Sequence, residues 1–122
     1  MATKFKIITP AYNCAKAIKT TLYSIIGQTY NNWEMIVLDD MSTDDSVEML
    51  KICRGSDKRI FLRKNDIKKW ALKNVIDVAR DYQEEEIIIG ILDADDCLCN
   101  ENTVELLLHA YDDDTELLHV GT

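Results

Sequence analysis

Four adjacent positions, Asp93-Ala94-Asp95-Asp96, carry the strongest chemical signal in the chain. Carboxylates held this close repel one another and raise each other's pKa unless a cation neutralises them. A hard divalent ion such as Mg2+ or Mn2+ does so, using carboxylates together with the phosphate oxygens of a substrate. The alternative is a solvated acidic turn before the next helix, a role that Asp96 can fill in part. The turn directly follows an apolar run and faces another acidic strand end, which favours the metal site.

A second acidic pair, Asp39-Asp40, precedes the segment Met41-Ser42-Thr43-Asp44. A carboxylate at a strand end can accept hydrogen bonds from a pyrimidine N–H or a ribose hydroxyl. Helix capping by residues 42–44 is the structural alternative. Capping does not explain why two aspartates stand before the cap, so we expect one of them to contact a ligand.

A third polar cluster is Pro10-Ala11-Tyr12-Asn13. The Tyr12 ring could stack against a base, or it could pack on the sheet rim in a tight exit turn; the residues alone leave both readings open. Positive charge near the same rim could come from Lys68, Lys69 and Lys73, although lysines on a helix usually form only a solvated face.

Short apolar runs alternate with helical periodicity along the whole chain. Strands are expected over residues 5–9, 34–38, 59–63, 86–92 and 116–120. The helices between them are predicted from apolar positions on one face: Ile18, Leu22, Ile25 and Ile26; Val47, Leu50 and Cys53; Leu72, Val75, Ile76 and Ala79; Val104, Leu107, Leu108 and Tyr111. Pro10 is expected to stop the first strand because it donates no ladder hydrogen bond. The run 87–92, apolar on both faces, is expected to be a central strand of a covered sheet.

This alternation predicts an α/β fold, a three-layer sandwich with a mostly parallel sheet and helices on both faces, in a single domain over residues 1–122. Ligands of such sheets bind at the carboxyl ends of the strands, near a switch in strand order. The three polar clusters all follow strand ends, so we expect them to converge on one rim.

Composition narrows the class of partner. The 122 residues are 47% hydrophobic and 30% charged, which is normal for one globular domain. A net charge of −8 argues against nucleic acid or an anionic bilayer as partner, whereas an anionic ligand stays compatible if a metal ion supplies positive charge. The sequence has neither an apolar run of membrane-span length nor a signal peptide, and the four cysteines are expected to be reduced thiols. These features favour a cytoplasmic location.

Two other α/β classes fit the alternation but not the motifs. A response-regulator receiver domain needs an acidic pair after the first strand and an Asp after the third, where this chain has Thr9-Pro10 and Arg63-Lys64. A dinucleotide-binding Rossmann domain needs G-x-G-x-x-G, which the glycines of this chain cannot form.

Four motifs follow one another in a fixed order. They read P-x-Y-N at residues 10–13, S-I-x-x-Q-T-Y-x-x-W-E at 24–34, I-V-x-D-D-x-S-T-D at 36–44 and L-D-x-D-D at 92–96. Together they resemble the inverting glycosyltransferase family 2, whose GT-A fold belongs to the Rossmann-like nucleotide-diphospho-sugar transferases. The resemblance extends over almost the whole chain and is weakest from Lys51 to Arg80.

The resemblance implies a role for each matching residue. Pro10, Tyr12 and Asp40 would border the nucleobase, usually uracil, and Asp39 would lie beside the ribose or support the turn. Asp93 and Asp95 would form the D-x-D pair at the ribose and a Mn2+ or Mg2+ ion, with Asp96 next to the metal and the sugar. Asn13 and Ala94 belong to the same donor-binding set.

The region after the third strand departs from the family pattern. An N-G-G loop and an A-R-N segment usually approach the diphosphate there, but this chain reads Asn65-Asp66-Ile67 and Leu72-Lys73-Asn74. Lys73 would keep the positive charge at the diphosphate without the bidentate fork of arginine.

The resemblance also implies an acceptor half that this sequence does not supply. In the family, a later region holds the acceptor groove and the Asp or Glu that deprotonates the acceptor hydroxyl. The C-terminal third offers no candidate for this base: Asp112-Asp113-Asp114 is typical of a solvated turn, and His109 and His119 are expected to be structural. The chain is therefore expected to be the donor-binding part of a longer protein or of an oligomer.

The implied function is an enzymatic one, in polysaccharide biosynthesis. A sugar would pass from a nucleotide-diphospho-sugar, by family default a UDP-sugar, to a hydroxyl of a glycan, lipid-linked or protein acceptor, with inversion and with a divalent metal. A partner or a missing region could place the chain at the cytoplasmic face of a membrane. The alternative is a non-catalytic nucleotide-sugar-binding domain or a truncated remnant, which shares every motif.

Overall fold

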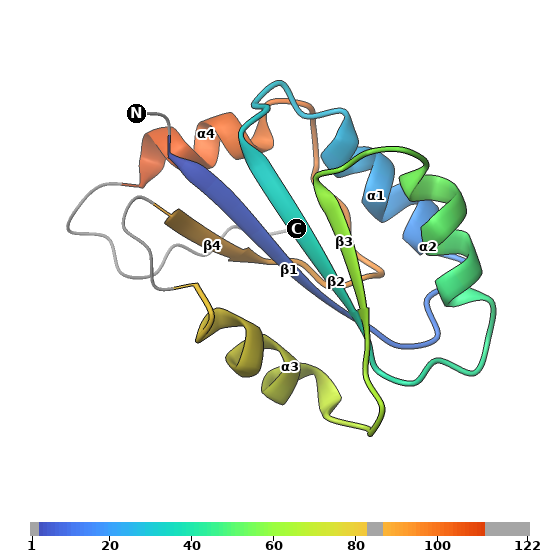
Figure 1. Cartoon of the computed structure of the whole chain (residues 1–122). Helices are drawn as coiled ribbons and strands as arrows, with labels where there is room; N and C mark the ends of the chain where they lie inside the picture. Colours follow the sequence, from blue (N-terminus) through green and yellow to red (C-terminus); the bar gives the residue numbers. More distant parts are fainter. Residues whose placement is uncertain (1–2, 83–86, 112–122) are drawn as a thin grey trace.

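The computed structural model describes residues 3–82 and 87–111, in which strands and helices alternate (Figure 1). The elements are β1 (Lys4–Ala11), α1 (Ile18–Ile26), β2 (Trp33–Asp39), α2 (Ser46–Arg54), β3 (Ile60–Lys64), α3 (Trp70–Ala79), β4 (Ile87–Ile91) and α4 (Thr103–Ala110). The four strands form one parallel sheet in the order β3-β2-β1-β4. The predicted α/β class and parallel sheet are thus confirmed, while the strand predicted over residues 116–120 lies outside the described residues.

Helices cover both faces of the sheet, so the molecule has two apolar layers. On one face, α1, α2 and α4 pack against the inward side chains of the strands, with Leu22, Leu50 and Val104 among the buried contacts. On the other face, Val78 of α3 packs against Ile8 and Ile36. Figure 1 shows α3 on the side of the sheet opposite α1 and α2. This layering leaves the carboxyl ends of the strands free of helices.

β1 does not end at Pro10 as predicted but runs on to Ala11, where it still pairs with β2. The reason lies in the direction of the hydrogen bonds. Ala11 accepts a bond from Asp40 of the β2 side, whereas Ile8 accepts one from Leu92 of the β4 side, so alternate residues of β1 serve alternate neighbours. The missing N–H of Pro10 therefore faces the β4 side, where the pairing of β1 with β4 has already ended at Ile8 and Ile91.

The buried face of α3 differs from the predicted stripe. Val75 and Ala79 of that stripe pack against the core as expected, but Leu72 and Ile76 are exposed, and the fully buried residues are Asn74 and Val78. In this orientation Asn74 turns toward the loop after β3, where its carboxamide oxygen accepts a hydrogen bond from Asn65. The orientation of the helix therefore combines apolar packing on the sheet with a polar contact at its rim.

β4 is also placed differently from the prediction. Within the described part of the chain it pairs only with β1 and forms an edge of the sheet, and Ile91 is 61% exposed. Ile89 and Ile91 stand beside Lys6 and Ile8 in the register, on the face covered by α3, but α3 packs on β1 and β2. The apolar run is therefore not a covered central strand among these residues; β1 and β2 are.

Two further observations concern the described residues as a whole. None of their helices has the length and apolar content of a membrane span. All four cysteines are free thiols, as expected, with Cys14 and Cys53 buried and Cys97 and Cys99 exposed.

Candidate functional site

A cleft of about 680 Å³ opens where β1, β2 and β4 end and α3 begins, and its volume is in the range of small-ligand sites. Most of the residues predicted for the donor and the metal line it: Pro10, Tyr12, Asn13, Asp40, Asp93, Ala94 and Asp95. Three predicted residues, Asp39, Asp96 and Lys73, are not part of the lining. The strand ends therefore do bring the three polar clusters to one rim.

The aspartate turn closes one end of this cleft. Oxygen atoms of Asp93, Asp95 and Asp96 lie within 4.8 Å of one another. Burial, and after it the neighbouring charges of Asp96 and Asp95, raise the pKa of Asp93. Among the described residues, no donor bonds to any of the three carboxylates, so their oxygens remain available to a hard divalent cation. The donor set fits Mn2+ or Mg2+, and a bound ion would remove the repulsion that raises the Asp93 pKa.

Helix α1 holds the backbone of this turn in place. The Thr21 hydroxyl is buried and lies 2.8 Å from the carbonyl oxygen of Ala94 and 2.5 Å from that of Asp96. One turn further along, the Ser24 hydroxyl accepts a hydrogen bond from the Leu98 amide at 3.1 Å. Because these contacts bind the backbone, the carboxylates are oriented without losing any of their acceptor positions.

The Gln28-Thr29 pair of the second motif secures the exit of the turn. Gln28 is buried, donates to the carbonyl of Asn100 at 2.7 Å and accepts the Val104 amide at 3.0 Å. The Thr29 hydroxyl lies 3.0 Å from a carboxylate oxygen of Glu105. These contacts tie the end of α1 to the start of α4, which gives the motif a structural role that its letters did not reveal.

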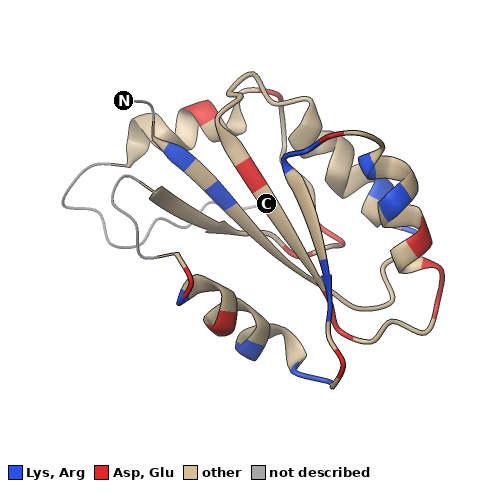
Figure 2. Ribbon diagram, in the orientation of Figure 1, with Lys and Arg blue, Asp and Glu red and all other residues tan. Residues whose placement is uncertain are grey.

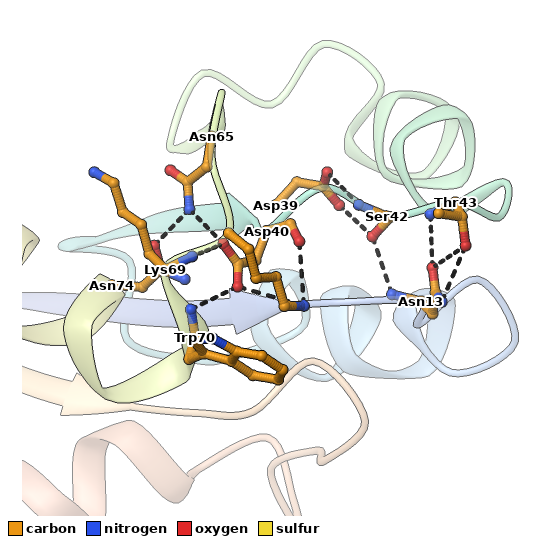
Figure 3. A network of polar contacts seen from close by, with 10 residues as sticks. Asn13, Asp39, Asp40, Ser42, Thr43, Asn65, Lys69, Trp70 and Asn74 are labelled. Atoms are coloured by element: carbon orange, nitrogen blue, oxygen red, sulfur yellow. Dashed lines mark hydrogen bonds and ion pairs between the residues drawn. The ribbon is translucent and has the colours of Figure 1, made fainter.

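Asp40 lies at the opposite side of the cleft and caps helix α3 (Figure 3). Its carboxylate accepts hydrogen bonds from the backbone amides of Lys69 at 2.8 Å and Trp70 at 2.7 Å, and from the Asn65 carboxamide at 3.0 Å. Burial alone would raise the pKa of Asp40, but these hydrogen bonds and the charge of Lys68 outweigh it and lower the pKa to about 2. The carboxylate is therefore ionised and already well supplied with donors.

Asp39 and Asn13 hold the loop between β2 and α2. Asp39 is buried and accepts hydrogen bonds from the Ser42 amide and hydroxyl, while the Asn13 carboxamide oxygen accepts the Thr43 amide at 2.8 Å (Figure 3). Since α2 begins only at Ser46, neither Ser42 nor Thr43 caps it, whereas Asp44, the third residue of the capping alternative, accepts the Ser46 amide at 2.9 Å. Of the two roles considered for Asp39, these contacts are those of a residue that supports the turn.

Two aromatic rings and a lysine form the wall between Asp40 and the cleft opening. Tyr12 is 50% exposed and Trp70 is 70% exposed. The Lys68 ammonium lies 3.1 Å from the centroid of the Tyr12 ring and 4.7 Å from that of Trp70. Trp70 has a φ of 66°, a left-handed value that is unusual for a bulky residue, and it begins α3. Figure 2 shows the basic positions at the start of this helix.

The lysine of the lining is not the one carried over from the family pattern. Lys73 is exposed and pairs with Asp77 at 3.4 Å, whereas Lys16 and Lys68 line the cleft. Trp70 and Asn74 were also missed. Asn74 lines the cleft and its carboxamide nitrogen has no partner among the described residues. The sequence signal for Asn74 was its match to the asparagine of the family's A-R-N segment, of which only the lysine position was carried over as a site residue.

Comparison with known proteins decides the family. The sequence model of the family described as "Glycosyl transferase family 2" matches residues 6–122, nearly the whole chain. The chain belongs to glycosyltransferase family 2. The resemblance seen in the four motifs is thereby confirmed, and relatives of this family 2 chain are named transferases.

One relative is WfgD of Escherichia coli, named as a UDP-Glc:alpha-D-GlcNAc-diphosphoundecaprenol beta-1,3-glucosyltransferase. It is 38% identical over 90 residues, which are 74% of this family 2 chain and 34% of WfgD. The chain thus spans about a third of the length of this relative.

Solved structures show the same GT-A fold at lower identity. S. aureus TarS 1-349, solved in complex with UDP, is 23% identical with a TM-score of 0.72 over 87% of this family 2 chain and 31% of that TarS fragment. The mannosyltransferase PcManGT of Pyrobaculum calidifontis, solved with GDP-Man and Mn2+, is 23% identical with a TM-score of 0.72 over 83% of the chain and 30% of PcManGT.

Proposed function

We propose that this chain is the donor-binding part of a glycosyltransferase that moves a sugar from a nucleotide-diphospho-sugar to an acceptor hydroxyl with inversion. The observation that carries the proposal is the pairing, in one cleft, of Asp93 and Asp95 at one end, with Asp96 grouped beside them, and of Tyr12 and Asp40 at the other. A base at Tyr12 and a diphosphate at the aspartate turn would fill such a cleft from end to end.

The residues divide the work of binding. Asp95, with Asp93 and Asp96, would hold Mn2+ or Mg2+, which when bound offsets the charge of the diphosphate leaving group. The backbone contacts of Thr21 and Ser24 would keep these carboxylates aimed at the ion. Pro10 and Tyr12 would border the base, and Asn13 and Asp39 would fix the loops behind it. Lys16 is better placed than Lys73 to approach the phosphates, because it lines the cleft.

The donor is proposed to be a UDP-sugar. WfgD is named for a UDP-sugar donor and TarS was solved with UDP, whereas PcManGT was solved with GDP-Man, so the family accommodates more than one base. For the acceptor, we favour a lipid-linked or other glycan of polysaccharide biosynthesis, by likeness to the acceptor in the name of WfgD. The charge and the cysteines support a cytoplasmic reaction. The general base that deprotonates the acceptor is left unassigned.

The test is calorimetric titration of UDP into the chain with and without Mn2+, compared with the Asp95→Ala variant. We expect binding that requires Mn2+ and is lost in the variant. UDP binding that is indifferent to the metal would refute the metal-assisted site. GDP in place of UDP, titrated under the same conditions, decides the nucleotide.

A non-catalytic nucleotide-sugar-binding domain is the second candidate, because the aspartate turn and the Tyr12-Asp40 end of the cleft would serve donor binding without transfer equally well. It predicts the same metal-dependent binding but no turnover. Release of UDP from UDP-sugars with acceptor glycans present separates the two: turnover that Asp95→Ala abolishes supports the transferase, and tight binding without turnover supports the binding domain.

A further inference from the structure

Lys68 places one ammonium group on two surfaces that a nucleobase would need. Besides its contact with the Tyr12 ring, its Nζ lies 3.5 Å from a carboxylate oxygen of Asp40 and 3.3 Å from the Asp40 carbonyl oxygen. An ammonium over an aromatic ring is attracted by the ring's electrons, and the carboxylate adds a charge partner. Both attractions hold the Lys68 ammonium between the Tyr12 ring and the Asp40 carboxylate.

The first surface is the face of the Tyr12 ring. A base stacks on an aromatic ring at van der Waals distance, and an ammonium 3.1 Å from the ring centroid occupies that space. Lys68 and Tyr12 both line the cleft, so the covered face is the one turned toward a ligand. A base and the Lys68 ammonium cannot share it.

The second surface is the Asp40 carboxylate. A carboxylate offers about four acceptor positions. Asn65 and the Lys69 amide take two on one oxygen, and the Trp70 amide and Lys68 approach the other. The Lys68 contact is the longest of the four and the one made by a flexible side chain. A base N–H would therefore gain an acceptor on Asp40 most easily by replacing Lys68.

We propose that Lys68 is a displaceable plug of the nucleobase subsite. In the unliganded chain it covers Tyr12 and completes the coordination of Asp40, and a base binds only after the ammonium has been expelled from both. The inference rests on the proposed function, because it takes Tyr12 and Asp40 as the base-binding pair. It follows that the apparent affinity for a base equals the intrinsic affinity multiplied by the fraction of molecules in which Lys68 has left the subsite.

Uridine is the probe, because it carries the base and ribose but no phosphate that a displaced lysine could attract. Binding to the full chain is measured by NMR titration for the wild type, Lys68→Ala and Lys68→Met. Removal of the ammonium is expected to tighten uridine binding about 5- to 30-fold in both variants, the range given by one cation–π contact and one partly exposed ion pair. Lys68→Met keeps the length of the side chain, so the gain would be due to the charge.

The matched control is Lys19→Ala. Lys19 lies 5.8 Å over the Tyr23 ring and is not part of the cleft lining, so this variant also removes one charge and one cation–π pair. Its uridine affinity is expected to equal that of the wild type. An equal gain in Lys19→Ala would show a general charge effect and would overturn the plug.

The outcomes separate this inference from the proposed function. If the wild type binds UDP with Mn2+ but neither Lys68 variant binds uridine more tightly, the plug is wrong and the donor site stands. If neither the wild type nor any variant binds UDP or uridine, both fall together.

Discussion

The two acidic strand ends of this chain look alike in sequence and are built in opposite ways. At the aspartate turn after β4, Thr21 of α1 hydrogen-bonds to the backbone, and the described residues offer the carboxylates no donor. At the end of β2, the Asp39 and Asp40 carboxylates are both buried and both occupied by protein donors. The carboxylates of the aspartate turn are therefore available to a ligand, whereas those of Asp39 and Asp40 mainly stabilise loops and the start of a helix.

This contrast shows that adjacent aspartates identify a site only when their donors are known. Repelling carboxylates that are held in place are destabilising until a cation arrives, whereas carboxylates with amide donors stabilise the fold as they stand. The two acidic strand ends should therefore respond in opposite ways to the same substitution of aspartate by asparagine.

The largest effect is expected on metal affinity. Asp95→Asn should weaken Mn2+ binding on the order of 100-fold, because one of three oxygen ligands loses its charge. Asp39→Asn should change Mn2+ affinity by less than about twofold, since that carboxylate is bonded to Ser42 and is not one of the three grouped carboxylates. Electron paramagnetic resonance of free Mn2+ measures both. A similar loss of Mn2+ affinity in both variants would show that the two acidic strand ends do not differ in metal binding.

The next effect concerns the hydrogen bonds from Thr21 to the backbone of the aspartate turn. Thr21→Val removes the hydroxyl beside the carbonyls of Ala94 and Asp96 and should lower the free energy of unfolding by about 1–3 kcal/mol. It should also weaken Mn2+ binding, an effect that stability alone would not produce. Thr21→Ser keeps the hydroxyl and should retain the wild-type Mn2+ affinity. A valine variant that binds Mn2+ as the wild type does would assign Thr21 to stability only.

A smaller loss is expected at the other strand end. Asp40→Asn should destabilise the fold by about 1–2 kcal/mol at neutral pH, because the α3 amides lose a charged cap. The folded pKa of Asp40 is about 2, below its ordinary value of 3.8, so this stabilisation is present above about pH 4 and is lost as the pH falls toward 2. Denaturant unfolding at pH 7 and pH 3 should show the difference between variant and wild type shrinking. A difference independent of pH would mean that the charge of Asp40 is not what stabilises α3.

The smallest effect has the opposite sign. Without metal, Asp93→Asn should raise stability by a few tenths of a kcal/mol, because it relieves repulsion from Asp95 and Asp96. The raised pKa of Asp93 means that its ionisation costs stability as the pH rises through its folded pKa, so the gain should be greater at pH 7 than at pH 3. With saturating Mn2+ the order should reverse, since the wild type gains more from the ion. Thermal unfolding with and without Mn2+ tests this.

The sequence predicted the fold and the rim well because both depend on alternation along the chain. Apolar periodicity located every described helix, and the strand ends brought Tyr12, Asp40 and Asp95 to one cleft. What failed depended on contacts between distant residues. No local pattern says that Asp40 caps a helix that begins 30 residues later, or that Asn65 turns Asn74 inward.

The same reason explains the errors at the phosphate side. Lys73 matches a family arginine in order along the chain, but it is exposed and pairs with Asp77, one turn further along the same helix. Lys68, two residues before α3 begins at Trp70, lines the cleft instead. Order along the chain fixed neither the rotation of α3 nor the path of the loop before it.

Pro10 shows how one residue can end the pairing of β1 with β4 while leaving its pairing with β2 intact. The next rung between β1 and β4 would run from the amide of residue 10 to the carbonyl of Leu92, and proline has no hydrogen to give. The chain after Leu92 is thus released from the sheet one residue before the first aspartate. On its other side β1 stays paired with β2 as far as Ala11 and Asp39, so the sheet is longer toward β2 than toward β4 at the edge where the cleft lies. A residue with an amide hydrogen at position 10 would allow β1 and β4 to pair over further residues, and Asp93 would then belong to the sheet.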